Sequence, residues 1–216
     1  VRDQQRLRVG WYREAPLHGA RCSMSNPSAP RPRIVGLGGT TKAGSSTEKA
    51  LVACLAAAER LGAEVQVIPG TALACLPLYA PEETLRTPEQ LRFVDTVRQA
   101  DGLILATPAY HAGMSGLLKN AIDLLEDLRD EPRPYLDGRA VGCIVTAYGW
   151  QGAGTTLTSV RTIVHALRGW PTPLGVTLNT AMPLFDAAGV CTDPRIQTQF
   201  EMLAQQVVSF ASRFAT

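Results

Sequence analysis

The sequence has no long apolar run, little net charge and few histidines. Lysine and arginine total 21 and aspartate and glutamate total 19, which gives a formal net charge of +2. So small a charge argues against nucleic acid or an anionic membrane surface as a partner, and no apolar stretch is long enough to cross a bilayer. With three histidines in the chain, no Ser-His-Asp or Cys-His arrangement is evident.

Cysteines are also few, and their spacing is not that of a metal or redox site. There are five, an odd number, and no two of them form a Cys-x-x-Cys pair. We therefore predict no metal centre and a reducing, cytoplasmic setting. The cysteines are Cys22, Cys54, Cys75, Cys143 and Cys191.

Residues 1–32 differ from the rest of the chain. They are rich in arginine, contain prolines at their end and show neither helical nor strand periodicity. We interpret them as an N-terminal extension, part of it non-native, with Met24 as a candidate native start. Residues 33–216 are then expected to form a single domain.

After residue 32 the pattern alternates strictly between strands and helices. The predicted strands are 33–38, 64–68, 102–106, 140–146 and 172–177, and the predicted helices are 46–61, 88–100, 115–128, 154–167 and 194–214. Alternation of this kind predicts an α/β fold in which a five-stranded parallel sheet is covered by helices on both faces, a three-layer sandwich.

The segment 40–47, Thr-Thr-Lys-Ala-Gly-Ser-Ser-Thr, lies between the first predicted strand and the first predicted helix. Unpaired backbone N–H groups and the helix dipole at such a turn favour an anion. We therefore predict a phosphate-binding loop. The alternative is a Gly/Ser/Thr turn that only caps the helix.

Two other phosphate-binding patterns are excluded by single residues. Ser45 stands where a Walker loop needs lysine after Gly44, and Thr41 stands at the third glycine of a dinucleotide-binding pattern. A hydroxyl-rich loop suits a phosphomonoester such as flavin mononucleotide (FMN). The corresponding fold is flavodoxin-like, with strand order 2-1-3-4-5 and its ligand at the carboxyl ends of the strands.

Two further loops belong to that same edge. The loops 107–114 and 147–154 follow the third and fourth predicted strands, are rich in glycine and carry Tyr110, Tyr148 and Trp150. Aromatic faces and backbone N–H groups together suit a flat ring with a polar edge. The alternative is that these aromatics are surface or interface residues.

Three segments of the chain resemble the NADPH-dependent FMN reductase family, which is flavodoxin-like. They are Gly-Thr-Thr-Lys-Ala-Gly-Ser-Ser-Thr at 39–47, Leu-Pro-Leu-Tyr at 76–79, and the stretch from Thr107 to Asp123 with Pro-Ala-Tyr-His-Ala-Gly and Gly-Leu-Leu-Lys-Asn-Ala-Ile-Asp. The resemblance covers roughly residues 33–215 and is most specific from Thr107 to Asp123.

The resemblance implies a role for each matching residue. In the family the first loop holds the FMN phosphate and the next two hold the isoalloxazine ring. The phosphate residues implied here are Thr40, Lys42, Ser45 and Thr47, with Ser46 adjacent; the ring residues are Pro108, Ala109, Tyr110, His111, Ala112 and Gly113 on one side and Tyr148, Gly149, Trp150 and Gly152 on the other. His111 is also a candidate hydrogen-bonding partner of substrate or flavin, the alternative being simple exposure.

The resemblance also implies an activity and partners. It implies an NAD(P)H-dependent FMN reductase in which NADPH or NADH passes a hydride to flavin N5. The alternatives are an FMN-dependent dehydrogenase or quinone-type reductase with its own small-molecule substrate, and an electron carrier, which the slightly basic charge disfavours. A homodimer or homotetramer is expected through the apolar helix 115–128, and a flavin-dependent monooxygenase is a possible recipient of reduced flavin.

Overall fold

The computed structural model describes residues 31–214. The extension predicted for residues 1–32 lies outside the described residues except for its last two. Arg31 is tied to the domain, because its Nε donates to the carbonyl of Gly62 and its Nη2 to that of Ala63, both at 2.9 Å. The end of the predicted extension therefore packs with the domain.

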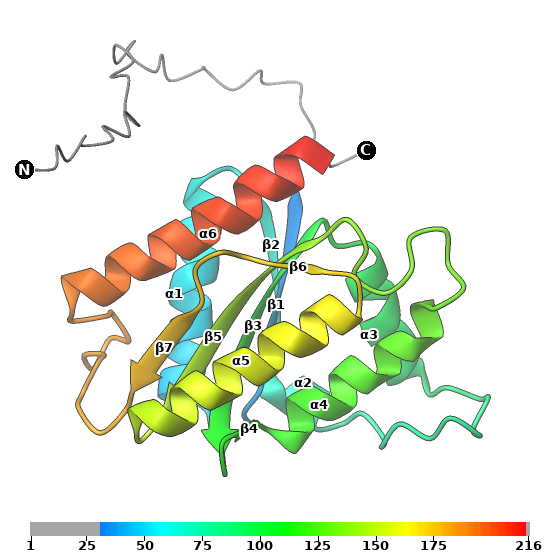
Figure 1. Cartoon of the computed structure of the whole chain (residues 1–216), viewed down its shortest axis with the longest axis horizontal. Helices are drawn as coiled ribbons and strands as arrows, with labels where there is room; N and C mark the ends of the chain where they lie inside the picture. The colour runs from blue at the N-terminus through cyan, green and yellow to red at the C-terminus, as the bar shows by residue number, and fades with distance from the viewer. Residues whose placement is uncertain (1–30, 215–216) are drawn as a thin grey trace, which may run out of the picture.

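A parallel sheet runs through the centre of the molecule (Figure 1). Its strands are β1 (Arg33–Gly38), β2 (Glu64–Ile68), β3 (Gly102–Tyr110), β5 (Ala140–Ala147), β6 (Trp170–Pro171) and β7 (Val176–Asn179). The order is β2-β1-β3-β5, and β6 and β7 both pair with β5 in parallel at the fifth position. The predicted fold class and order are confirmed, although the sheet has more strands than predicted.

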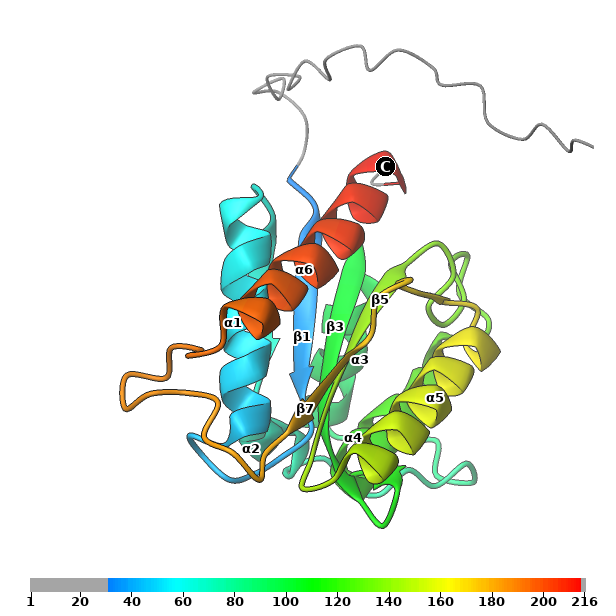
Figure 2. The same cartoon turned by 60° about the vertical axis from the view of Figure 1, so that its left-hand side comes forward.

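Helices cover both faces of this sheet (Figure 2). The helices are α1 (Ser46–Arg60), α2 (Gly70–Leu73), α3 (Pro88–Arg98), α4 (Gly116–Asp123), α5 (Trp150–Ala166), α6 (Pro194–Phe214) and the 3₁₀ helix η1 (Leu124–Leu128). Helices α1 and α6 pack together on one face, and α3, α4 and α5 lie on the other. In the described part of the chain no helix has the length and apolar character needed to cross a membrane.

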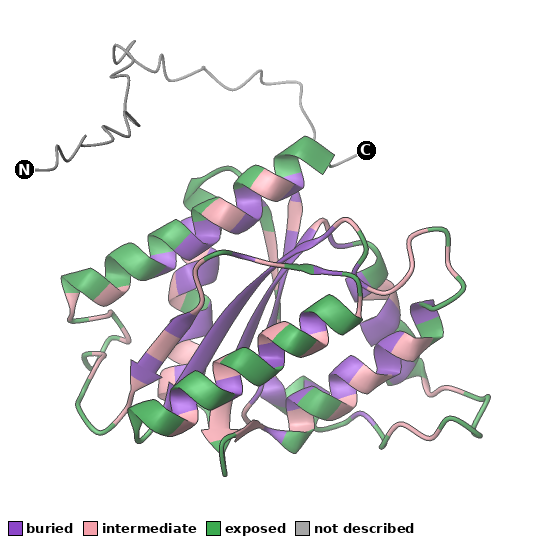
Figure 3. Ribbon diagram, in the orientation of Figure 1, coloured by how far each residue is buried: buried purple, intermediate pink, exposed green. Residues whose placement is uncertain are grey.

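Successive strand residues alternate between the two layers, as the pleat requires. Val35 and Leu103 face the α3–α5 layer, whereas their neighbours Ile34 and Ile104 face α1 and α6. Burial on both faces makes the strands continuous apolar runs, which Figure 3 shows as a buried centre under half-exposed helices.

Two predicted elements are divided in the structure. The predicted strand 172–177 is replaced by the short strands β6 and β7, since Pro173 has no N–H to donate to a ladder. The predicted helix 115–128 becomes α4 followed by η1. Leu118 on α4 and Leu124 and Leu128 on η1 are all buried within this chain. The width of that apolar face is thereby explained without a partner helix.

Arg139 closes the sheet at the amino end of β5. It is 0% exposed, and its guanidinium donates to four carbonyls, those of Ala100 at 2.8 Å, Arg98 at 2.6 Å, Tyr135 at 3.0 Å and Asp137 at 3.5 Å. Burial lowers the pKa of Arg139 to about 10, so the side chain stays charged at neutral pH. The last carbonyls of a helix have no hydrogen-bond donor within that helix. The planar guanidinium of Arg139 supplies donors to these carbonyls at the end of α3.

Candidate functional site

The carboxyl ends of β1, β3 and β5 meet at the lower side of Figures 1 and 2. The loop after β1 begins with Gly39, whose N–H donates to the carbonyl of Ala106 at 2.7 Å. A Cβ on Gly39 would lie 2.8 Å from that same oxygen and 3.1 Å from Ser115 Oγ. Only glycine therefore allows the loop to start in contact with β3.

The rest of this loop turns into helix α1. Thr40 Oγ1 accepts from Lys42 N at 3.2 Å, and Ser45 is the N-cap of α1, its Oγ accepting from Glu48 N at 3.2 Å. Ser46 follows as the first helical residue, and the first-turn amides of the helix have no intrahelical acceptor. Thr40, Ser45 and Ser46 are half-buried and Lys42 is exposed. These four predicted phosphate residues thus surround a helix N-terminus.

Thr47, the fifth predicted phosphate residue, points elsewhere. It is buried, and its Oγ1 lies 2.6 Å from Thr146 Oγ1 on β5. The two hydroxyls share one hydrogen bond and join the start of α1 to the sheet. The predicted direct contact of the Thr47 hydroxyl with phosphate does not fit this arrangement, because the side chain faces the sheet and not the outer side of the loop.

Gly70, at the start of α2, packs closely against the loop that follows β1. A Cβ there would come within 1.8 Å of the Thr40 carbonyl oxygen and 2.8 Å of that of Gly38. The backbone of α2 therefore contacts the backbone of this loop directly, and there is no room for a side chain at Gly70. The sequence analysis missed both α2 and Gly70; the Pro69-Gly70 pair directly after β2 was the available signal.

The second predicted loop, 107–114, is a hairpin and not an irregular loop. Strand β3 continues to Tyr110 and pairs with β4 (Gly113–Met114) in antiparallel register. His111 and Ala112 form the two-residue turn with φ of 51° and 61°. Positive φ at both central positions is the type I′ pattern of two-residue hairpins, which usually selects Asn and Gly. His and Ala at these positions store strain at the carboxyl edge, as is common at functional sites.

A serine and a threonine connect the hairpin to the first loop. Ser115 N donates to Thr107 Oγ1 at 3.0 Å, and Ser115 Oγ caps α4 by accepting from Leu118 N at 3.2 Å. Ser115 also lies next to the first loop, because a Cβ on Gly39 would be 3.1 Å from Ser115 Oγ. Neither Thr107 nor Ser115 was a predicted site residue, although Thr107 begins the predicted loop 107–114 and Ser115 directly follows it.

The third predicted loop is shorter than expected. Tyr148 and Gly149 lie between β5 and α5, whereas Trp150 and Gly152 belong to the first turn of α5, which begins four residues before the predicted start. Tyr148 is 81% exposed and Trp150 64% exposed; Tyr110, on the hairpin, is 58% exposed. The three aromatics that the sequence predicted for this edge are thus available to a ligand.

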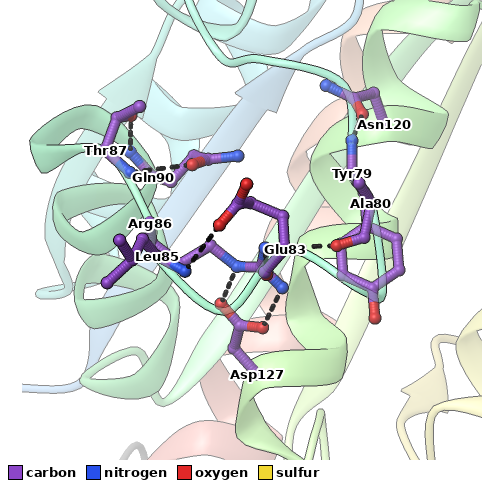
Figure 4. A network of polar contacts seen from close by, with 9 residues as sticks. All are labelled: Tyr79, Ala80, Glu83, Leu85, Arg86, Thr87, Gln90, Asn120 and Asp127. Atoms are coloured by element: carbon purple, nitrogen blue, oxygen red, sulfur yellow. Dashed lines mark hydrogen bonds and ion pairs between the residues drawn. The ribbon is translucent and has the colours of Figure 1, made fainter.

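The Leu76–Tyr79 segment is held at the same edge by a polar network (Figure 4). Tyr79 N donates to Asn120 Oδ1 at 2.8 Å, while Asn120 Nδ2 donates to the carbonyl of Pro77 at 3.0 Å. Arg86 makes a two-pronged contact with Asp127, at 2.8 and 2.9 Å, and lies 5.1 Å from the Tyr79 ring centroid. The hydrogen bond to Asp127 raises the pKa of Arg86. The network orders the segment without supplying a reactive group.

No group of three His, Cys, Asp or Glu side chains within residues 31–214 is placed to hold a metal ion. Burial raises the pKa of Cys54 and of Cys143 to about 12, which makes both thiols poor nucleophiles at neutral pH. The chemistry that this edge can offer is therefore recognition of a ligand by hydroxyls, backbone amides and aromatic rings.

Architecture and edge together define a flavodoxin-like α/β protein in which a hydroxyl-rich loop, a strained hairpin and three exposed aromatics lie at the carboxyl edge of the sheet. The model of the NADPH-dependent FMN reductase family matches residues 32–182, which is more than half of the chain. The chain belongs to this family, and the resemblance noted in the sequence is confirmed.

Similar proteins agree with this assignment. An NADPH azoreductase of Bacillus sp. is 34% identical over 105 residues, which cover 48% of this chain and only 56% of the relative's own length. An NAD(P)H-dependent FMN reductase of Pseudomonas aeruginosa is 29% identical over 179 residues, covering 81% of this chain and 91% of that protein. The solved flavoenzyme NAD(P)H:(acceptor) oxidoreductase FerB of Paracoccus denitrificans has a TM-score of 0.70 at 19% identity, covering 85% and 98% of the two chains, and so shares the fold.

Proposed function

We propose that this protein binds FMN at the carboxyl edge of its sheet and is an NAD(P)H-dependent FMN reductase. The observation that carries the proposal is the meeting of three segments, the loop at 39–45, the β3–β4 hairpin and the start of α5, at one edge. Family membership and the printed activity of the P. aeruginosa relative support it.

The loop after β1 fits a phosphate group. Its Gly44 N–H already donates to a carboxylate oxygen, Glu48 Oε2, at 2.6 Å, so the loop presents a donor suited to an anionic oxygen. The residues that would hold the phosphate are Thr40, Lys42, Ser45 and Ser46. Lys42 supplies a point charge and not the planar fork of arginine, and Thr47 stabilises the loop through Thr146.

The hairpin and the start of α5 would hold the flavin ring. The hairpin contributes the segment from Pro108 to Gly113, and Tyr148, Gly149, Trp150 and Gly152 contribute the opposite side. Bound FMN supplies the redox chemistry, acceptance of a hydride at N5 from NADPH or NADH and delivery of electrons to an acceptor. The protein's own part is to position the ring and shield it from water; the chain needs no catalytic acid for that, and His111 remains a candidate for contact with substrate or flavin.

A cavity beside Trp150 favours a second candidate, reduction of a dedicated small molecule. The cavity has a volume of about 830 Å³ and lies between the carboxyl end of β7 and the start of α6. Its apolar walls include Met182, Leu184 and Ile196, and its polar walls include Asn179, Gln199 and the charged pair Asp193 and Arg195. Mixed apolar and polar walls of this size are typical of small-molecule sites, and an aromatic or quinone-like acceptor would suit them.

The test of the proposed function uses the full chain. We expect the purified protein to bind FMN and to oxidise NADPH or NADH in air when free FMN is supplied. A protein that binds no flavin and shows no turnover would contradict the proposal. Tight flavin with turnover only when a small-molecule acceptor is added would favour the second candidate.

Replacement of the helix cap tests the position of the phosphate. Ser45→Ala should raise the Kd for FMN about tenfold, because it removes a hydroxyl that can donate to the charged phosphate, a hydrogen bond worth about 1.5 kcal/mol, and leave riboflavin binding unchanged. Ser209→Ala, on the exposed side of α6, is the matched control. Equal FMN affinity in the two variants would mean that the phosphate lies elsewhere.

The predicted homodimer or homotetramer stays a prediction, as do the cytoplasmic location and a monooxygenase partner. The helix expected to form the dimer interface buries its apolar residues within its own chain. Light scattering at several protein concentrations would determine the oligomeric state.

A further inference from the structure

The loop after β1 contains a carboxylate of its own chain. Glu48 is the third residue of α1, and its Oε2 accepts from Gly44 N at 2.6 Å. Gly44 has a φ of +67° and is exposed. In a common capping box the acidic residue bonds to the N-cap amide. Here the N-cap amide of Ser45 donates to the carbonyl of Lys42 at 3.3 Å, so the carboxylate extends one residue further out, into the loop.

This carboxylate takes a donor that a phosphate would also need. Glu48 is the only acidic residue from Gly39 to Ala58, and Lys42 is the only basic residue of the segment 40–47. The helix N-terminus and Lys42 attract an anion, whereas a second negative charge a few ångströms away repels it. Glu48 therefore reduces the positive potential that the loop offers to a phosphate.

We propose that Glu48 determines how tightly the site holds the phosphate of FMN. Its carboxylate accepts from Gly44 N–H at 2.6 Å, so a phosphate oxygen that uses this amide has to displace the carboxylate. The result is a weakened phosphate grip, which makes FMN an exchangeable substrate and not a permanently held group. This inference rests on the proposed function, since it concerns the same site.

The experiment compares FMN with riboflavin, which lacks the phosphate. Glu48→Gln keeps the size, the helix preference and an acceptor for Gly44 N–H but removes the charge. Glu59→Gln removes the same charge from an exposed position at the far end of α1, about 16 Å away by helical rise. We expect Glu48→Gln to lower the Kd for FMN about tenfold, with riboflavin affinity within about twofold of the parent chain and no effect of Glu59→Gln on either ligand. Quenching of flavin fluorescence measures all six affinities.

Inorganic phosphate provides a second probe that needs no flavin. Phosphate should raise the melting temperature of Glu48→Gln more than that of the parent chain, because ligands stabilise the state that binds them. An unchanged Kd for FMN in Glu48→Gln, an equal gain for riboflavin, or an equal gain in Glu59→Gln would each overturn the role of Glu48. If the parent chain binds FMN, such a result leaves the proposed function standing; if the parent chain binds neither flavin, both proposals fall.

Discussion

The amino and carboxyl edges of the sheet use their polar groups in opposite ways. At the amino edge Arg139 is buried and donates to four carbonyls, and Arg31 donates to two more. At the carboxyl edge Tyr148 and Trp150 are exposed, and His111 has a strained backbone. The sheet thus has one edge that is closed by hydrogen bonds from buried and surface arginines, and an opposite edge that exposes aromatic side chains to solvent.

The difference teaches where stability and function lie in this fold. Polar groups paired within the chain contribute to the free energy of unfolding, because a buried group without a partner costs more than a typical bond contributes. Groups left open at the carboxyl edge contribute little until a ligand satisfies them. Substitutions at the two edges should therefore separate stability from binding.

Loss of Arg139 should have the largest effect on stability. Arg139→Met keeps most of the side-chain volume but leaves buried carbonyls without donors, so we expect the free energy of unfolding to fall by about 3–5 kcal/mol. Urea unfolding followed by circular dichroism measures the change. The same substitution at Arg92, which is exposed and paired with Glu89 on the surface of α3, should cost less than about 1 kcal/mol. Similar losses in the two variants would contradict the closed-edge interpretation.

Gly70→Ala should damage the carboxyl edge with a smaller loss of stability. The new methyl group would collide with the Thr40 carbonyl, and the forced shift should cost about 1–3 kcal/mol and raise the Kd for FMN at least about tenfold. Gly154→Ala is the matched control, since nothing lies within 4 Å of its Cβ position on α5. Unaltered FMN affinity in Gly70→Ala would show that α2 does not support the phosphate loop.

His111→Gly should have the smallest effect, and of opposite sign. Glycine adopts the positive φ at no steric cost, so the free energy of unfolding should rise by about 0.5–1 kcal/mol. FMN binding should weaken severalfold, because the more flexible turn must be ordered when the ring binds. Thermal unfolding and fluorescence titration measure the two effects. A variant that is less stable than the parent chain would show that the His111 side chain, and not backbone strain, matters at the turn.

Much of the fold could be predicted because it depends on local patterns. The predicted helix 88–100 begins where the structure has it, since Thr87 is a good cap residue and Pro88 suits the first helical turn, and the structure has the full capping box there. The apolar runs of β1 and β5 marked buried parallel strands. The boundaries near the site were less predictable: the hairpin at His111 and the early start of α5 at Trp150 depend on contacts with distant segments, and propensity does not encode them.

By itself the sequence determined the layers, the strand order and the edge at which a ligand is expected. The reason is that hydrophobic periodicity, helix capping and loop composition depend on residues that are close together in the chain. Only the tertiary structure decided which side chains face that edge. It turned Thr47 inward to Thr146, brought Gly70 against Thr40 and closed the opposite edge with Arg139. Each of these depends on backbone segments that are far apart in the chain and meet only when the sheet and its helices pack.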